Sequence, residues 1–222
     1  EYLINMPQEN KINLSIIISA FNEVNLIKKS LTELIVVMER CSFNYELIII
    51  DDGSTDETLE KVYEFKKINS KIEINIIYNN KNIGKTASLV KGFKVSKGQY
   101  IIIHDADLEY DPNDIIRLYD EIISNTDLKA VYGSRYLEKN YNNKQQFVYY
   151  IANIINLYLF NFLFNSKLTD LHSCYKIFKQ EILINFNFRS KRFGFELEIS
   201  AFLFKENLLL KEIPIKYKAR NK

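Results

Sequence analysis

Three carboxylates follow one apolar run of the chain at a spacing of two residues. After the run ends at His104, Asp105, Asp107 and Glu109 alternate with Ala, Leu and Tyr. In an extended backbone, residues i and i+2 project to one face, so Asp105 and Asp107 would lie together and Glu109 could join them. Carboxylate oxygens suit Mg²⁺ or Mn²⁺, which keep bound waters and accept phosphate oxygens as further ligands. We therefore predict a divalent metal site here, with a solvated acidic turn as the alternative.

A second acidic pair, Asp51 and Asp52, follows another apolar run. A carboxylate at a strand end can accept hydrogen bonds from the N–H groups of a nucleobase, which favours that base over bases lacking such a donor. Turn and helix-capping chemistry is the alternative, because Ser54 and Glu57 fit a capping box for the helix that follows. The pair therefore predicts a nucleotide contact or a helix start, and both interpretations stay open.

Lys85 lies in the segment NIGKTA, whose end matches a phosphate-binding loop. Asn79 stands where that motif needs its first glycine, so the loop that would cradle a phosphate is missing. No G-x-G-x-x-G follows the first strand, which removes the usual dinucleotide fingerprint. The remaining interpretation places Lys85 beside an anionic ligand at a helix N-terminus, where the helix dipole and the ammonium group act together. A solvated lysine is an equal alternative.

The composition of the 222-residue chain excludes several classes of protein. Lys and Arg number 30 against 28 Asp and Glu, a net charge of +2 that is too balanced for a dedicated nucleic-acid binder. Cys41 and Cys174 show neither metal-type spacing nor a disulfide framework, which favours a reducing, cytoplasmic setting. His104 and His172 lack the spacing of a zinc set, so we expect structural roles for both. No signal-peptide pattern opens the sequence.

Apolar runs alternate with amphipathic segments through the first 133 residues. We expect strands at 14–19, 46–50, 73–78, 99–104 and 129–134, and helices at 25–40, 56–68, 85–96 and 112–124. The last of these helices would be capped by Asp111 and begin at Pro112. Such repetition predicts an α/β fold with a mostly parallel central sheet and helices on both faces. Ligands of such sheets bind beyond the carboxyl ends of the strands, where the acidic pairs and Lys85 are expected to lie.

The regular alternation of apolar runs and amphipathic segments ends at about residue 135. We expect a helix at 147–165, a short strand at 174–178, a helix at 194–205 and a last strand at 210–218, all within one domain. The helix at 147–165 is apolar but is interrupted by asparagines, so it suits the plane of a membrane surface better than a span across it. A buried core helix is the alternative. Nearby basic residues, including Lys139, Lys144, Lys167 and Arg192, could face anionic head groups.

Seven sequence blocks occur in this chain order: SIIISAFNE, IIIDDGSTDET, NIGKTASLVKGFKVSKGQYIIIHDADLEYDP, VYGSRY, LTDLHSCYKIFK, RFGFELEIS and EIPIKYKAR. Taken together, they resemble family 2 of the inverting glycosyltransferases. Within that family the chain looks most like enzymes that move a hexose from a nucleotide sugar to polyprenyl or dolichyl phosphate, such as dolichyl-phosphate mannose synthases. The resemblance covers roughly residues 12–220.

The resemblance implies a GT-A fold over residues 1–222, with a nucleotide-sugar-binding half at about 12–133 and an acceptor half at about 134–220. It also implies a divalent metal. Asp105 and Asp107 would be the metal-binding D-x-D pair, and Glu109 would stand where the family often has a third polar ligand.

Further residue roles are implied by the same resemblance. Ala20, Phe21, Glu23 and Asp52 would surround the nucleotide base and ribose. This chain departs from the family pattern at two positions, because Ser19 stands where Pro is common and Phe21 where Tyr is frequent. In the other half, Arg135 would meet the acceptor phosphate, Asp170 would lie near the reacting centre, and Arg220 would reach a donor phosphate.

The chemistry of such a transfer sets its own requirements. Negative charge builds on the departing nucleotide, and a cation held by Asp105 and Asp107, with Lys85 and Arg220, would neutralise it. A phosphate acceptor is already anionic near neutral pH, so Asp170 would position rather than deprotonate, whereas a sugar hydroxyl would need a true base.

We expect a metal-dependent hexosyltransferase that acts on polyprenyl or dolichyl phosphate and is peripheral on the cytoplasmic face of a membrane. The alternative is a family-2 enzyme with a saccharide hydroxyl as acceptor in cell-surface polysaccharide synthesis. A homo-oligomer and the choice between donors of the GDP-mannose and UDP-glucose type stay open.

Overall fold

The computed structural model describes residues 11–137 and 147–219, with the backbone alone for 147–150. Its elements are β1 (Leu14–Ala20), α1 (Ile27–Met38), β2 (Tyr45–Asp51), α2 (Thr58–Ile68), β3 (Glu73–Tyr78), α3 (Lys85–Val95), β4 (Tyr100–Asp105), α4 (Asn113–Ser124), β5 (Ala130–Ser134), α5 (Phe147–Phe164), β6 (Lys176–Lys179), α6 (Gln180–Ile184), α7 (Phe195–Lys205) and β7 (Leu210–Pro214). Every expected helix and strand is present. The short helix α6 was not predicted, and β7 ends at Pro214, earlier than the expected end at 218.

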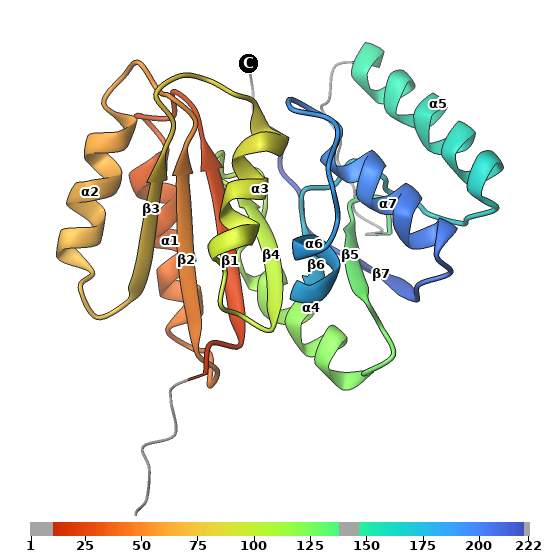
Figure 1. Ribbon diagram of the computed structural model, residues 1–222, viewed down its shortest axis with the longest axis horizontal. Helices are drawn as coiled ribbons and strands as arrows, with labels where there is room; N and C mark the ends of the chain where they lie inside the picture. Colours follow the sequence, from red (N-terminus) through yellow and green to blue (C-terminus); the bar gives the residue numbers. More distant parts are fainter. Residues whose placement is uncertain (1–10, 138–146, 220–222) are drawn as a thin grey trace, which may run out of the picture.

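The strands form one seven-stranded sheet in the order β3-β2-β1-β4-β6-β5-β7 (Figure 1). β1, β2, β3 and β4 pair in parallel, and so do β5 and β7. β6 lies between β4 and β5 and is antiparallel to both. The prediction of a mostly parallel sheet is therefore confirmed.

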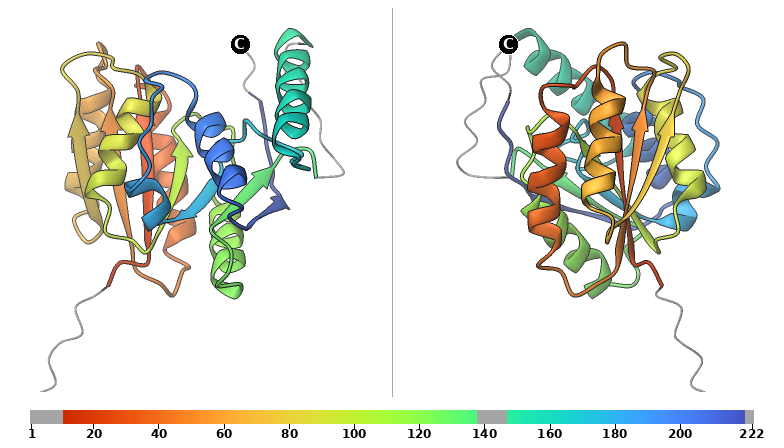
Figure 2. Two further views of the ribbon diagram at one scale, coloured as in Figure 1. Left: turned by 45° about the vertical axis from the view of Figure 1, so that its right-hand side comes forward. Right: turned by 90° about the vertical axis from the view of Figure 1, so that its left-hand side faces the viewer.

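Helices cover both faces of the sheet (Figure 2). α1 and α2 pack together on one face, and α4 lies on the same face (Figure 2), where its Tyr119 stacks on Phe43 of the loop between α1 and β2 with ring centroids 4.0 Å apart. α3 and α6 lie on the opposite face, where Phe93 of α3 contacts Phe195 of α7 with centroids 5.6 Å apart. α5 lies beyond α7 at the edge of the molecule (Figure 1). The central strands are thus buried on both sides, which explains why they read as continuous apolar runs.

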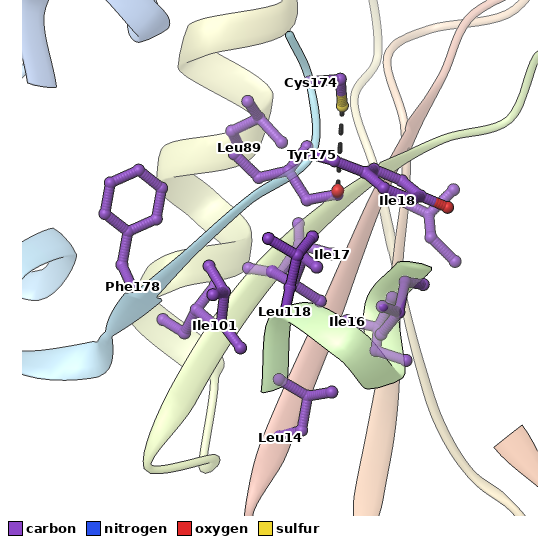
Figure 3. Packing of buried hydrophobic residues seen from close by; sticks show 14 of the residues in the cluster. Leu14, Ile16, Ile17, Ile18, Leu89, Ile101, Leu118, Cys174, Tyr175 and Phe178 are labelled. Carbon is purple, nitrogen blue, oxygen red and sulfur yellow. Dashed lines mark hydrogen bonds between the residues drawn. The ribbon is translucent and has the colours of Figure 1, made fainter. Parts of the chain in front are cut away.

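The core is built from the aliphatic residues of β1, β2 and β4. Ile16, Ile17 and Ile18 are fully buried, and Leu89 of α3 and Leu118 of α4 join the same cluster. Figure 3 shows these side chains close to the strands, with the Cys174 thiol directed at the carbonyl oxygen of Ile103. This packing holds the carboxyl ends of the central strands in fixed positions.

Two helix starts differ in detail from expectation. The capping box of Ser54 and Glu57 is wrong: the amide of Thr58 donates to the Asp56 carboxylate at 3.0 Å, and Ser54 Oγ accepts from the amide of Asn22. At α4 the Asn113 amide donates to the Asp111 carboxylate at 2.9 Å, but the helix begins at Asn113, so Pro112 occupies the N-cap position that was expected for Asp111.

Candidate functional site

The register of the sheet brings the polar strand ends together. Ala20 of β1 lies opposite Asp51 of β2, and Ser19 lies opposite Asp105 of β4. Because these three strands run parallel, their carboxyl ends meet at one edge, as the sequence predicted. A cavity of about 720 Å³ opens there, and Asp105 and Asp107 both line it. We call it the strand-end cavity.

Asp105 and Lys85 form an ion pair in the strand-end cavity. The Lys85 ammonium nitrogen lies 2.7 Å from one Asp105 oxygen and 3.0 Å from the other, and each side chain is only about one-fifth exposed. Burial opposes charge on both groups, yet their mutual attraction outweighs it, so the pKa of Asp105 is lowered and that of Lys85 is raised. Both groups are charged near neutral pH, and Asp105 already attracts a cation.

Lys85 is the first residue of α3, so it lies at a helix N-terminus as expected, but two neighbouring amides of that helix end already have acceptors within the protein. The Thr86 amide donates to the carbonyl of Arg192 at 2.9 Å, and the Ala87 amide donates to the carbonyl of Lys191 at 3.0 Å. Lys85 contributes to the strand-end cavity with its side chain, as a charged group.

Asp107 lies in a turn, so the extended backbone that we predicted for Asp105, Asp107 and Glu109 ends at Asp105. β4 ends at Asp105, and Leu108 has a φ of 62°. Asp107 accepts a hydrogen bond from the Glu109 amide at 3.1 Å, while the Glu109 carboxylate accepts one from the Tyr217 hydroxyl at 2.7 Å. Asp107 still reaches the strand-end cavity, and it also lines a second cavity of about 700 Å³ that Glu109 shares.

The three carboxylates are not gathered around one point. Among the residues that the structure describes, no group of three or more His, Cys, Asp or Glu side chains is placed to hold a metal ion. Asp105 and Asp107 share a cavity, and Glu109 faces the neighbouring one. A dication at the end of β4 would therefore take Asp105 and Asp107 from the protein and its other ligands from water and phosphate, as Mg²⁺ commonly does.

Asp52 organises the loop that follows β3. Its side chain is 2% exposed, and it accepts hydrogen bonds from the Ile83 amide, the Gly84 amide and the Asn79 side chain, each at 2.9 Å. These bonds fold the segment before α3 back over the end of β2. Asp52 lines the strand-end cavity, but internal hydrogen bonds already occupy its carboxylate.

The residues expected at the base and ribose lie at the end of β1. Phe21 is 44% exposed and lines the strand-end cavity together with Glu23. The Glu23 amide donates to Thr58 Oγ1 at 2.8 Å, which fixes this loop to the start of α2. Ala20 is buried, and its carbonyl accepts from the Asp52 amide at 2.8 Å, so it supports the cavity without lining it.

Arg135 and Asp170 form a buried pair. Arg135 Nε and Nη2 donate to the two Asp170 oxygens at 2.7 and 2.8 Å, and the Arg135 amide donates at 3.0 Å. Burial alone would raise the pKa of Asp170, but the hydrogen bonds and charge of Arg135 outweigh it and the pKa is lowered. The guanidinium carbon also lies 5.0 Å from the ring centre of Tyr217, a residue of the second cavity. Asp170 is therefore an ionised partner of Arg135.

Arg220 lies outside the described residues.

Two groups at the site were missed by the sequence analysis. Arg192 and Phe193 line the strand-end cavity, whereas the sequence had grouped Arg192 only with the basic residues that could face lipid head groups. Glu212 of β7 accepts from the amides of Thr169 and Asp170, at 2.8 and 3.0 Å, and so holds the segment that carries the buried pair. The blocks RFGFELEIS and EIPIKYKAR contained or bordered these residues, but nothing in their spacing showed which strand end they approach.

His104 has the structural role expected from the sequence. It is 2% exposed, and its ring nitrogens contact the Tyr175 hydroxyl at 2.8 Å and the Ser30 hydroxyl at 3.3 Å. Burial lowers its pKa to about 4, so the imidazole is neutral at physiological pH.

The seven-stranded, mostly parallel sheet with helices on both faces is a GT-A fold, the fold of its solved structural neighbours. The model of the family Glycosyl transferase family 2 matches residues 15–186, and the chain belongs to that family.

Two relatives agree with this assignment, and a solved structure shares the fold. Dolichol-phosphate mannosyltransferase of Pyrococcus furiosus is 32% identical over 129 residues, 57% of this chain and 34% of that protein. Dolichyl-phosphate beta-glucosyltransferase of Dictyostelium discoideum is 28% identical over 226 residues, 95% of this chain and 68% of that protein. Glucosyl-3-phosphoglycerate synthase of Mycobacterium tuberculosis, solved with Mn²⁺, UDP-glucose and phosphoglyceric acid, superposes with a TM-score of 0.71 at 17% identity, over 95% of this chain and 73% of that one. The chain thus spans about a third of the length of the Pyrococcus relative.

Proposed function

We propose that this chain transfers a hexose from a nucleotide sugar of the GDP-mannose or UDP-glucose type to a polyprenyl or dolichyl phosphate at a membrane surface. The observation that carries the proposal is the strand-end cavity, in which Asp105 and Asp107 face Phe21 and Glu23. The family and the names of its relatives support transfer to a lipid phosphate.

The residues at the end of β4 fit a divalent cation, Mg²⁺ or Mn²⁺. Both aspartates offer hard oxygen ligands, and Asp105 already lies in ion-pair contact with the Lys85 ammonium group, so this position stabilises positive charge. When bound, the cation neutralises negative charge that develops on the departing nucleotide diphosphate. Lys85 would keep Asp105 ionised and oriented, and its own charge would add to the neutralisation.

Arg135 and Asp170 support the acceptor side of the reaction in this proposal. Asp170 is held by Arg135 through two side-chain hydrogen bonds, so it orients the guanidinium and does not remove a proton. A lipid phosphate needs no proton removed, because its second ionisation has a pKa of about 6. The arrangement therefore favours a phosphate acceptor over a sugar hydroxyl.

The exposed face of α5 supports a lipid acceptor. Seven apolar side chains at helical spacing form what we call the α5 stripe. These residues are Ile151, Ile154, Ile155, Tyr158, Leu159, Phe162 and Leu163, each 39–79% exposed. On the other side of the helix, Phe160 is 2% exposed and contacts Phe204 of α7, with ring centroids 5.8 Å apart. Lys167 follows the helix and is exposed.

The α5 stripe fits a helix lying in the plane of a membrane surface, where apolar residues enter the acyl boundary. In the described part of the chain, no helix has the length and apolar character needed to cross a membrane. We propose that α5 lies on the membrane that contains the acceptor, and that the protein acts at its cytoplasmic face.

A donor screen tests the proposal. The chain would be incubated with polyprenyl phosphate, Mn²⁺ or Mg²⁺ and each radiolabelled nucleotide sugar. We expect label in an organic-extractable lipid that is labile to mild acid, no transfer with EDTA, and a loss of at least about a hundredfold for Asp105→Ala. Asp127→Asn is the control, because Asp127 is exposed in the loop between α4 and β5. Label that enters only a water-soluble saccharide would support the hydroxyl-acceptor alternative, and full turnover by Asp105→Ala would contradict the metal assignment.

A further inference from the structure

The segment before α7 forms a wall of the strand-end cavity from the C-terminal half of the chain. Arg192 and Phe193 line the cavity together with Phe21, Lys85 and Asp105. Figure 1 shows this segment beside the start of α3, where residues about 106 positions apart in sequence are hydrogen bonded. The segment therefore closes a site whose other residues come from the N-terminal half.

The wall is fixed at both ends. The carbonyls of Arg192 and Lys191 accept hydrogen bonds from the amides of Thr86 and Ala87 in the first turn of α3. Thr86 Oγ1 also donates to the Arg192 carbonyl, at 2.9 Å. Toward α7, the amides of Arg189 and Ser190 donate to the Glu198 carboxylate at 2.8 and 2.6 Å. These bonds use the backbone of the wall, and its side chains at 192 and 193 stay available to the cavity.

Gly84 permits this close approach. Its φ is 98°, and a Cβ at this position would lie 2.5 Å from the carbonyl oxygen of Lys191. A glycine is required where two backbones meet so closely and φ is positive. The contact between the wall and the start of α3 is therefore built into the sequence at residue 84.

Negatively charged residues outnumber positively charged ones in the cavity lining, so Arg192 would be important for binding an anion there. Lys85 is paired with Asp105, and Asp107, Glu23 and Asp52 add further negative charge to the lining. Among the described residues Arg192 forms no ion pair. A diphosphate entering the cavity meets this guanidinium, whose planar fork suits phosphate oxygens.

Phe193 is 85% exposed although it borders a cavity. An aromatic ring placed at the mouth of a polar site by an anchored backbone loses its contact with water when a ligand packs against it. Phe21, another residue of the cavity lining, is also partly exposed, at 44%. A nucleotide sugar offers flat or apolar ring faces that such side chains cover.

We propose that Arg192 and Phe193 are donor-binding residues: Arg192 pairs with the diphosphate of the nucleotide sugar, and Phe193 covers the bound donor. This inference rests on the proposed function and adds the C-terminal half to the donor site. Because the wall is anchored before the ligand arrives, little ordering is needed on binding.

Binding measurements by calorimetry test this inference without turnover. UDP, GDP, UDP-glucose and GDP-mannose would each be titrated with Mn²⁺ into the wild-type chain and its variants. We expect Arg192→Ala to weaken binding of the preferred nucleotide about tenfold, Arg192→Lys to weaken it less, and Phe193→Ala to weaken it about fivefold. Arg189→Ala is the matched control, because it removes the same charge from an exposed position that does not line the cavity. Tyr63→Ala is the corresponding control for the exposed aromatic ring.

The outcomes separate this inference from the proposed function. If the wild-type chain binds a nucleotide but Arg192→Ala and Arg189→Ala bind it equally well, the role of Arg192 is refuted and the transferase proposal stands. If Phe193→Ala binds like Tyr63→Ala, the role of Phe193 is refuted in the same way. If the wild-type chain binds none of the four nucleotides, both proposals fall together.

Discussion

Replacing Asp170 by alanine is expected to destabilise the fold strongly. The substitution leaves the Arg135 guanidinium, in a residue that is 4% exposed, without the two carboxylate oxygens that it contacts at 2.7 and 2.8 Å. It also removes the acceptor for the amides of Arg135 and His172. Breaking a buried ion pair by removing one partner typically costs about 3–5 kcal/mol, because the remaining charge is buried without compensation.

Urea unfolding followed by circular dichroism measures this effect. With an m-value of about 2.5 kcal/mol per M, a loss of about 4 kcal/mol lowers the unfolding midpoint by about 1.5 M. The control is the double variant Arg135→Met with Asp170→Leu, in which neither charge remains. We expect its stability to lie much closer to wild type than that of Asp170→Ala, since paired removal avoids a lone buried charge.

The pH dependence of unfolding gives a second test of the pair. The pKa of Asp170 is lower in the folded protein than its unfolded value of about 3.9. The stabilisation is therefore fully present above about pH 4 and is lost as the pH falls through the folded pKa. The difference between wild type and Asp170→Ala should be constant from pH 8 to 5 and shrink below about pH 4. A loss under about 1 kcal/mol at pH 7, or a double variant as unstable as the sum of the single variants, would refute the reasoning.

Two further predictions concern the α5 stripe and the loop after β3. Phe162 and Leu163 are 79% and 63% exposed, so the variant Phe162→Ser with Leu163→Ser should weaken binding to anionic liposomes, measured by sedimentation, roughly a hundredfold. The control Ile68→Ser changes an exposed residue of α2, at 72%, and should bind like wild type. Equal binding by all three proteins would contradict a membrane role for α5. Asp52→Ala removes the acceptor of three hydrogen bonds. It should lower the free energy of unfolding by about 2–4 kcal/mol in urea titrations. An unchanged unfolding midpoint would show that these bonds contribute little to stability.

The arrangement of the N-terminal half followed from local patterns in the sequence. Strands buried on both faces must be continuously apolar, so LSIIIS and QYIIIH identified β1 and β4 within one residue. Parallel pairing then placed Asp52, Lys85 and Asp105 at one edge, and the cavity lies there. These predictions needed only periodicity and the general topology of α/β sheets.

The side-chain partners could not be predicted in the same way. Nothing local indicates that Leu108 adopts a positive φ, and Glu109, which follows this turn, does not line the strand-end cavity that Asp105 and Asp107 share. The pairing of Arg135 with Asp170 joins residues 35 positions apart and depends on where β6 and β7 enter the sheet. The wall at Arg192 depends on the same long-range placement.

Because β6 comes late in the chain, its partner strands β4 and β5 are synthesised well before they can pair with it. β4 and β5 both pair with β6, whose residues Lys176–Lys179 leave the ribosome long after the two strands that they join. Until then each of those strands presents an open hydrogen-bonding edge, which invites pairing with other chains. A chain stalled or cleaved before Lys176 would keep these edges open, and we expect it to aggregate or to depend on chaperones.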